Sequence, residues 1–132
     1  MEFDRADAAK GELPEAFRPH FQGAARFQQL TSPFPEGPNV FFVHFEAGGR
    51  TRPHVHHTGQ VLHIVAGEGV VADGSGRHVV GPGDVVTVMP DEWHWHGGSP
   101  SSPMSHLTVQ FGGDDVSWDV DEGDWASGYG AG

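Results

Sequence analysis

The sequence contains no cysteine, and this absence removes two kinds of structure and chemistry. A scaffold held together by disulfides is excluded, and so is a site built on a thiolate. Cysteine usage therefore gives no indication of the compartment in which the protein resides. Any metal that the chain binds must be held by nitrogen and oxygen atoms.

Basic residues are also scarce, with seven lysines and arginines against 18 aspartates and glutamates. The formal net charge is −11 with histidine neutral, and no basic residue follows Arg77. This balance argues against nucleic acid as a partner, because binding to phosphates requires positive charge. Residues 112–132 form an acidic tail that we expect to be solvated. The tail also contains three aromatic residues, Trp118, Trp125 and Tyr129. Aromatic side chains in a tail usually pack against another surface, so we expect these three to do so.

Long apolar runs are missing as well. No segment approaches the ~20 apolar residues of a membrane-spanning helix, and the N-terminus lacks the apolar stretch of a signal peptide. We therefore expect a cytoplasmic protein with no membrane partner. The 132 residues predict one domain, spanning 1–132. Residues 1–23 mix charge and proline with a short helix-compatible piece around 4–10, which predicts a loosely ordered N-terminal arm.

Twenty glycines and ten prolines are present, and they fall between short apolar runs. This pattern predicts strands joined by turns. The predicted strands cover residues 24–30, 39–46, 61–65, 69–72, 77–80, 85–88 and 107–111. The turn residues at 73–76 predict a hairpin, whereas the prolines of 32–38 predict irregular backbone. Because no helix alternates with the strands, we expect an all-β fold, a small antiparallel β-barrel or jelly roll.

Two histidine clusters carry the strongest chemical signal. His54 and His56 stand two residues apart, so on a strand their imidazoles point to the same face. Gln60 follows on the same strand or on a bent continuation of it, and His94 would complete the site from a distant strand. Such ligands suit Fe, Mn, Ni or Zn and leave positions open for substrate or water. The alternatives are a half-exposed strand with incidental histidines and a surface patch that collects nickel.

The first cluster resembles the first sequence motif of the cupin superfamily. That motif runs Gly, five residues, His-x-His, three or four residues, Glu, six residues, Gly. In this chain the matching residues are Gly48, His54, His56, Gln60 and Gly67. The spacing is intact, and glutamine stands in place of glutamate.

The second cluster resembles the second cupin motif, which runs Gly, five residues, Pro-x-Gly, two residues, His. Gly83, Met89, Asp91 and His94 keep that spacing, with methionine replacing the proline and aspartate replacing the glycine. The second change is mild, because aspartate tolerates left-handed backbone better than most residues. The resemblance covers roughly residues 40–111 and implies a compact cupin.

Within the cupins, the chain is similar to the small bacterial group related to carboxymuconolactone-decarboxylase-associated cupins, which includes the manganese- or iron-dependent cupin hydroxynitrile lyases. This resemblance implies one divalent metal per chain, Mn, Fe, Zn or Ni. It implies a ligand set of His54, His56, Gln60 and His94. It further implies that His106 is the catalytic base and that Thr51 and His96 line the site. A core histidine hydrogen-bonded to a neighbour is the alternative for His106.

The resemblance also implies a homodimer and a function. Replacing Glu by the neutral Gln60 leaves the metal more electron-poor and a better Lewis acid. We therefore expect a metal-dependent lyase- or cyclase-type enzyme doing non-redox acid/base chemistry on a small carbonyl-type substrate. One alternative is an Fe(II)-dependent cupin dioxygenase. A second is a polyketide cyclase, because the chain is also similar to small metal-binding polyketide cyclases of actinomycetes. A non-catalytic barrel that binds a small molecule is a third.

Overall fold

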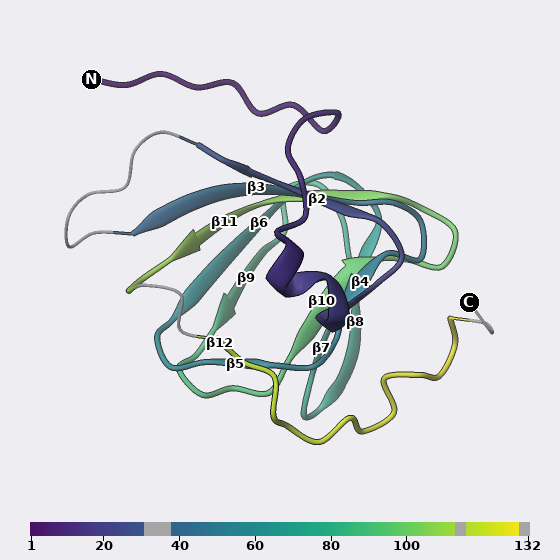
Figure 1. The fold of residues 1–132 in the computed structure, drawn as a ribbon. Helices are drawn as coiled ribbons and strands as arrows, with labels where there is room; N and C mark the ends of the chain where they lie inside the picture. The colour runs from purple at the N-terminus through teal and green to yellow at the C-terminus, as the bar shows by residue number, and fades with distance from the viewer. Residues whose placement is uncertain (31–37, 113–115, 130–132) are drawn as a thin grey trace.

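The computed structural model describes residues 1–30, 38–112 and 116–129, and its regular structure is almost all β (Figure 1). The strands in chain order are β1 (Phe21–Gln22), β2 (Ala25–Gln29), β3 (Asn39–Phe45), β4 (Arg50–Thr51), β5 (Val55–His56), β6 (Gln60–Gly67), β7 (Gly69–Asp73), β8 (Gly76–Val80), β9 (Val85–Val88), β10 (Trp95–Gly98), β11 (Met104–Gln110) and β12 (Val116–Ser117). A 3-10 helix, η1 (Glu15–His20), precedes them.

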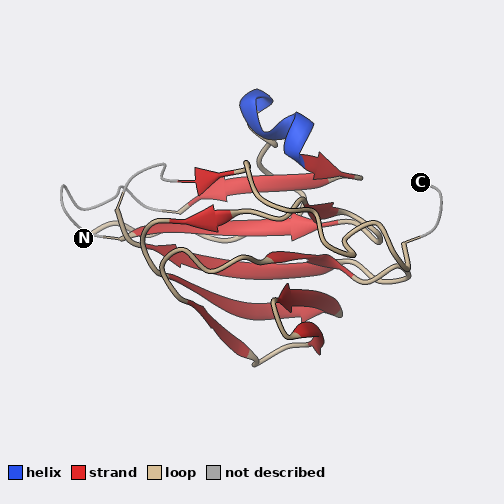
Figure 2. Cartoon of the chain, turned by 90° about the horizontal axis from the view of Figure 1, so that it is seen from below, coloured by secondary structure: helices blue, strands red, loops and turns tan. Residues whose placement is uncertain are grey.

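Two five-stranded antiparallel sheets form the body of the molecule. One sheet has the strand order β1-β4-β10-β7-β8 and the other the order β2-β3-β11-β6-β9, while β12 and β5 form a separate two-stranded ribbon. The strands lie in layers with η1 outside them at one end (Figure 2). The expected all-β fold, an antiparallel jelly roll, is confirmed.

The main core lies between the two sheets, where alternate residues of each strand point inward. Leu62 and Ile64 of β6 are fully buried, whereas His63 between them is exposed on the outer face. The buried members of the core are Ala25, Val43, Phe45, Ile64, Val71, Val80 and Met104. This packing brings the inward faces of β3, β6 and β11 against the other sheet.

A second apolar cluster lies on the outer face of the sheet that contains β10. Val70, Ala72 and Trp95 point outward there, and Trp125 and Tyr129 of the C-terminal segment cover them. The acidic side chains in the described part of this segment, Asp119, Asp121, Glu122 and Asp124, stay exposed at the same time. The docking expected for Trp125 and Tyr129 is therefore observed, while the acidic groups remain in solvent.

Most predicted strands are present with ends within a few residues of those expected, and so is the hairpin between β7 and β8. The predicted irregular segment 32–38 lies outside the described residues except for Pro38. Strand β10 was not predicted, because Gly97 and Gly98 look like turn residues. They are needed in the strand, since a Cβ at Gly97 would collide with Arg50 and the Gly49 carbonyl oxygen.

The helix-compatible piece at 4–10 does not form a helix. Its backbone groups are instead bonded to side chains of β2. The Asp7 amide donates to Gln28 Oε1 at 3.0 Å, and Arg26 Nε donates to the Ala8 carbonyl at 2.7 Å. The observed helix η1 starts directly after Pro14. In the parts of the chain that are described, no helix has the length and apolar character to cross a membrane.

Candidate metal centre and cavity

Backbone pairing places the distant histidine beside the first pair. The His54 amide donates to the His94 carbonyl at 3.0 Å, and the His94 amide donates to the His54 carbonyl at 3.1 Å. This isolated antiparallel bridge aligns two residues that lie forty positions apart in the chain. His56 follows in β5, so all three imidazoles come from adjacent extended segments.

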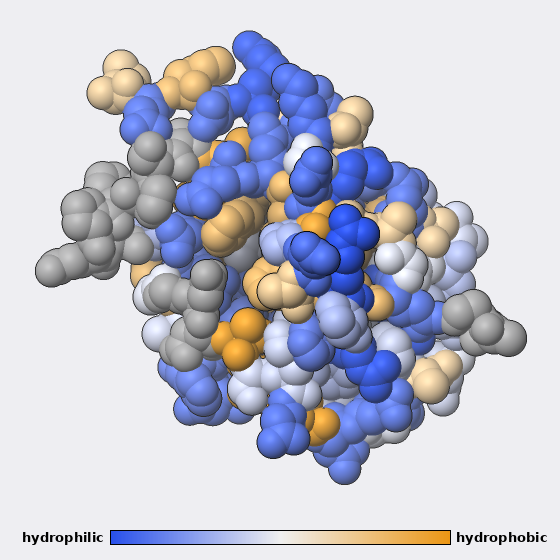
Figure 3. Space-filling model, viewed as in Figure 1, coloured by the Kyte–Doolittle hydropathy of each residue, from blue (hydrophilic) through white to orange (hydrophobic). Residues whose placement is uncertain are grey.

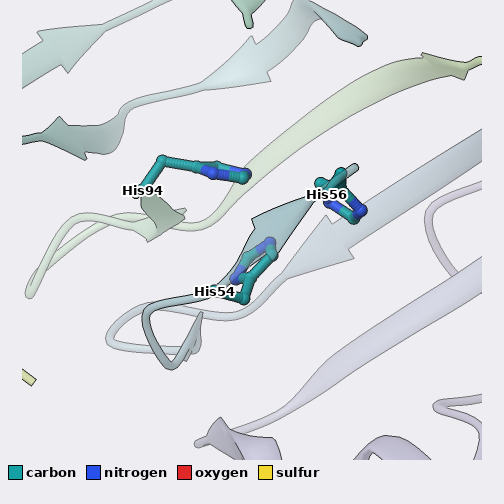
Figure 4. A group of neighbouring side chains, drawn as sticks. All are labelled: His54, His56 and His94. Atoms are coloured by element: carbon teal, nitrogen blue, oxygen red, sulfur yellow. The ribbon is translucent and has the colours of Figure 1, made fainter. Parts of the chain in front are cut away.

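The three histidines form a compact group of potential ligands (Figure 4). One ring nitrogen of each of His54, His56 and His94 lies within 4.8 Å of the others. All three side chains are buried. Gln60, the first residue of β6, is also buried, with 5% of its surface exposed.

Hydrogen bonds orient the rings of His54 and His94 so that their inner nitrogens keep a lone pair. His54 Nδ1 donates to the Arg52 carbonyl at 2.8 Å, and His94 Nδ1 donates to the Glu92 carbonyl at 2.9 Å. Because a carbonyl only accepts, the proton of each neutral ring sits on Nδ1 and Nε2 is free to bind a metal. At the third ring the Gln110 amide nitrogen lies 2.9 Å from His56 Nδ1, and an amide nitrogen only donates. Metal binding by His56 Nε2 therefore requires the Gln110 amide turned over, so that its oxygen accepts from Nδ1–H.

Three buried atoms of the predicted ligand set lack a hydrogen-bond partner within the described structure. They are His56 Nε2, Gln60 Oε1 and His94 Nε2. Buried polar atoms are rarely left in this state, because losing contact with water costs free energy that a partner must offset. The donor set therefore fits a divalent transition metal bound by imidazole nitrogen and amide oxygen.

Burial keeps these histidines neutral. Desolvation lowers the pKa of His56 to about 4 and lowers the pKa of His94, while the pKa of His54 is held well below its usual value. Repulsion from neighbouring imidazolium charge adds to the effect at His54 and His56. Neutral imidazoles offer their lone pairs at pH 7, which is what a metal requires.

A cavity of about 470 Å³ opens beside the histidines, a size typical of small-molecule sites. Thr51, His54, His56, Gln60 and His96 contribute polar surface to it. Its apolar wall includes Phe17, Phe21, Phe27, Phe41, Val43 and Trp118. Figure 3 shows the face that carries η1, where apolar residues reach the surface among hydrophilic ones.

A buried chain of polar contacts runs behind the cavity wall. His106 is fully buried on β11, and its Nε2 lies 3.3 Å from His96 Nδ1. On the other side, His106 Nδ1 lies 3.1 Å from the hydroxyl of Thr108. His96 and Thr108 line the cavity, whereas His106 does not. His106 thus contacts two cavity-lining groups without reaching the cavity itself.

The structure brings all the sequence-predicted residues into one region. Thr51 accepts a hydrogen bond from the His96 amide at 3.2 Å, which holds the strand that follows His94. Sequence reasoning missed Gln110, although its spacing from His106 places it on the same face of β11. It also missed Trp118 as a cavity residue, and no local signal in the sequence indicates where the tail passes.

Comparisons with known proteins show similar sequences and similar folds. A curated relative, the (R)-mandelonitrile lyase of Granulicella tundricola, is 39% identical over 123 residues, covering 89% of this chain and 92% of the relative. The solved polyketide cyclase RemF from Streptomyces resistomycificus superposes with a TM-score of 0.74 at 16% identity, covering 93% of this chain and 89% of that chain. A cupin-like protein of Thermotoga maritima gives a TM-score of 0.71 at 29% identity, covering 76% of this chain and 80% of that chain.

The family model described as the cupin domain matches residues 41–110, which include both histidine clusters and every proposed ligand. Asp91, where the second cupin motif has glycine, adopts the left-handed backbone with φ of 61°, as expected for that turn. Sequence, site and fold agree, and the chain belongs to the cupin family.

Proposed function

We propose that the protein is a metal-dependent lyase that cleaves and forms the carbon–carbon bond of a cyanohydrin. The observation that carries this proposal is the group of unpartnered donor atoms on His56, Gln60 and His94, next to a cavity with an apolar wall. The relative named (R)-mandelonitrile lyase supports the reaction class, because the likeness extends over most of both chains.

His54, His56, Gln60 and His94 would hold one divalent metal ion per chain, Mn, Fe, Zn or Ni. All four side chains are neutral, because burial lowers the pKa of each histidine and the Gln60 amide carries no charge, so they leave the charge of the ion undiminished. When bound, the ion supplies a Lewis acid that stabilises negative charge on a substrate oxygen or a departing anion.

Proton transfer falls to the chain's own residues. Cleavage takes the proton from the cyanohydrin hydroxyl, the electron pair of the broken carbon–carbon bond leaves with cyanide, and cyanide takes up a proton. His96 lines the cavity and is placed to exchange the proton with substrate, while His106 lies 3.3 Å behind it. Burial lowers the pKa of His106 to about 4, so its ring is neutral at pH 7 and is a weaker base than an exposed histidine, suited to passing a proton on rather than keeping it. In this arrangement His106, the predicted base, exchanges protons with the substrate by way of His96.

The test uses metal-depleted protein reloaded separately with Mn, Fe, Zn and Ni. Each form is incubated with (R)- and (S)-mandelonitrile, and benzaldehyde and cyanide are measured. We expect equal amounts of the two products, with a preference for one enantiomer and a rate that requires the metal. Failure of all four forms to cleave either enantiomer would contradict the proposal.

The alternatives make different predictions in the same experiment. An Fe(II)-dependent dioxygenase would consume oxygen with its substrate, whereas the proposed lyase keeps its full rate under anaerobic conditions. A polyketide cyclase would leave mandelonitrile intact, and the likeness to RemF at 16% identity supports only a common fold. A non-catalytic barrel would bind metal and small molecules without turnover. The homodimer and the cytoplasmic location stay predictions.

A further inference from the structure

The N-terminal helix η1 and the segment that follows β12 meet at one wall of the cavity. Trp118 comes directly after β12, which pairs with β5 in the register Val116 to His56. On the other side, η1 ends at His20. The indole of Trp118 is stacked on the His20 ring, with ring centres 4.5 Å apart and planes 3° from parallel. Trp118 therefore packs the C-terminal segment against the end of η1, next to β5, the strand that carries the proposed ligand His56.

Trp118 also contacts the metal centre directly. Its ring centre lies 4.7 Å from that of His54, a proposed ligand. The rings of Phe17 and Phe21 lie 6.1 and 6.2 Å away on the helix side. All four residues line the cavity. An apolar aromatic surface thus begins at the metal site and extends toward the helix.

The remainder of the tail anchors this wall. The indole of Trp125 donates to the Thr51 carbonyl at 2.8 Å, and the Trp125 carbonyl accepts from the buried guanidinium of Arg50. Before this anchor, Trp93 Nε1 donates to the Asp121 carbonyl at 2.6 Å. Trp118 is therefore held by β12 on one side and by these anchors on the other. A wall fixed in this way binds a planar group without first being ordered.

We propose that Trp118 is a specificity-determining residue and forms, with Phe17, a subsite for the aryl group of the substrate. Aromatic rings bind best to other rings in offset-stacked or edge-to-face arrangements, which this wall provides. The ligand class is therefore an aryl aldehyde or aryl cyanohydrin rather than a short aliphatic one. The claim that Trp118 sets substrate preference in turnover rests on the proposed function, whereas binding of an aryl group does not require turnover.

The experiment compares the metal-loaded wild type with Trp118→Ala and Trp118→Phe. Phe111→Ala, which removes a half-exposed aromatic side chain outside the cavity lining, is the matched control. For each protein, kcat/KM is measured with mandelonitrile and with the cyanohydrin of propanal. We expect Trp118→Ala to lower the ratio of aryl to alkyl kcat/KM by roughly 10- to 100-fold, whereas Trp118→Phe and the control keep it within about threefold.

A second measurement works without metal or turnover. Binding of benzyl alcohol, an unreactive aryl alcohol, to the metal-depleted proteins is measured by chemical-shift titration. We expect weaker binding in Trp118→Ala by about the same factor and unchanged binding in the control. Metal content and the unfolding midpoint of each protein are recorded alongside. If Trp118→Ala does not fold, Trp118→Leu makes the same comparison, because it keeps an apolar side chain and removes the ring.

The outcomes separate this inference from the proposed function. An unchanged aryl-to-alkyl ratio in a folded, metal-loaded Trp118→Ala protein would overturn the inference and leave the lyase activity standing. A wild type that cleaves neither cyanohydrin would overturn the proposed function, and the benzyl alcohol titration would then decide the inference alone. Equal affinity of wild type and Trp118→Ala in that titration would show that Trp118 only covers the metal site.

Discussion

Replacing His106 by phenylalanine should make the stability of the metal-depleted protein depend less on pH. His106 is fully buried, and burial lowers its pKa from the ordinary 6.5 to about 4. In the unfolded chain the imidazole regains the ordinary pKa, so between these two values the unfolded state binds a proton that the folded state does not. The contribution of His106 to stability is therefore full above pH 6.5 and is lost as the pH falls toward 4.

The size of this effect follows from the two pKa values. The difference between 6.5 and about 4, at about 1.4 kcal/mol for each pKa unit, corresponds to roughly 3 kcal/mol for one buried histidine. Between pH 4 and 6.5, one such histidine changes the free energy of unfolding by at most about 1.4 kcal/mol per pH unit. His54, His56, His94 and His96 also have lowered pKa values and steepen the wild-type curve, so the informative quantity is the difference between slopes.

The assay is urea denaturation followed by tryptophan fluorescence in the presence of a chelator, repeated across this pH range. The variant His106→Phe should lose stability less steeply than wild type by about 1.4 kcal/mol per pH unit in the middle of the window. The control is His63→Phe, which changes an exposed histidine on β6 and should keep the wild-type slope. Parallel curves for wild type and His106→Phe would refute the argument that burial sets the charge state of His106.

Four other outcomes are expected from the same geometry. Replacing His94 by alanine should remove metal and activity together, whereas His57→Ala, at an exposed histidine, should keep both in elemental analysis and rate measurements. Replacing His106 by alanine should keep the metal and lower turnover by about 10²–10⁴-fold; loss of metal would instead identify a ligand. Replacing Trp125 by alanine should lower the free energy of unfolding by about 3–5 kcal/mol in urea denaturation, and no change would contradict the anchoring of the tail on Arg50. Light scattering at micromolar concentration should give the mass of a homodimer, and a monomeric mass would contradict that prediction.

Much of the fold and of the metal centre follows from short-range pattern. Alternating apolar residues indicate the strands, and glycine-containing turns indicate where they end. Both signals involve residues that are close together in the sequence, so they can be recognised without the structure. The spacing of His54 and His56 places them together for the same reason. Asp91 was identified as a tolerated replacement for glycine, and it does adopt the left-handed backbone.

The rest depends on contacts between segments far apart in the sequence. β10 is a strand because β4 and β7 pair with it on both sides, although Gly97 and Gly98 weaken its own strand propensity. The position of Trp118 depends on the pairing of β12 with β5, which no local periodicity encodes. Alternation along β11 places Gln110 on the same face as His106, so that residue was within reach of sequence reasoning.

The two faces of β10 link the outer apolar cluster to the cavity. Trp95 points outward and is fully buried under Trp125, while the next residue, His96, points inward to the cavity. The same relation holds at Thr51, whose hydroxyl accepts from the His96 amide and whose carbonyl accepts from the Trp125 indole. Removing the tail's anchor would therefore expose Trp95 and release one hydrogen bond on Thr51 at the same time. For this reason the packing of the tail on the outer face helps to fix the position of the cavity histidines on the inner one.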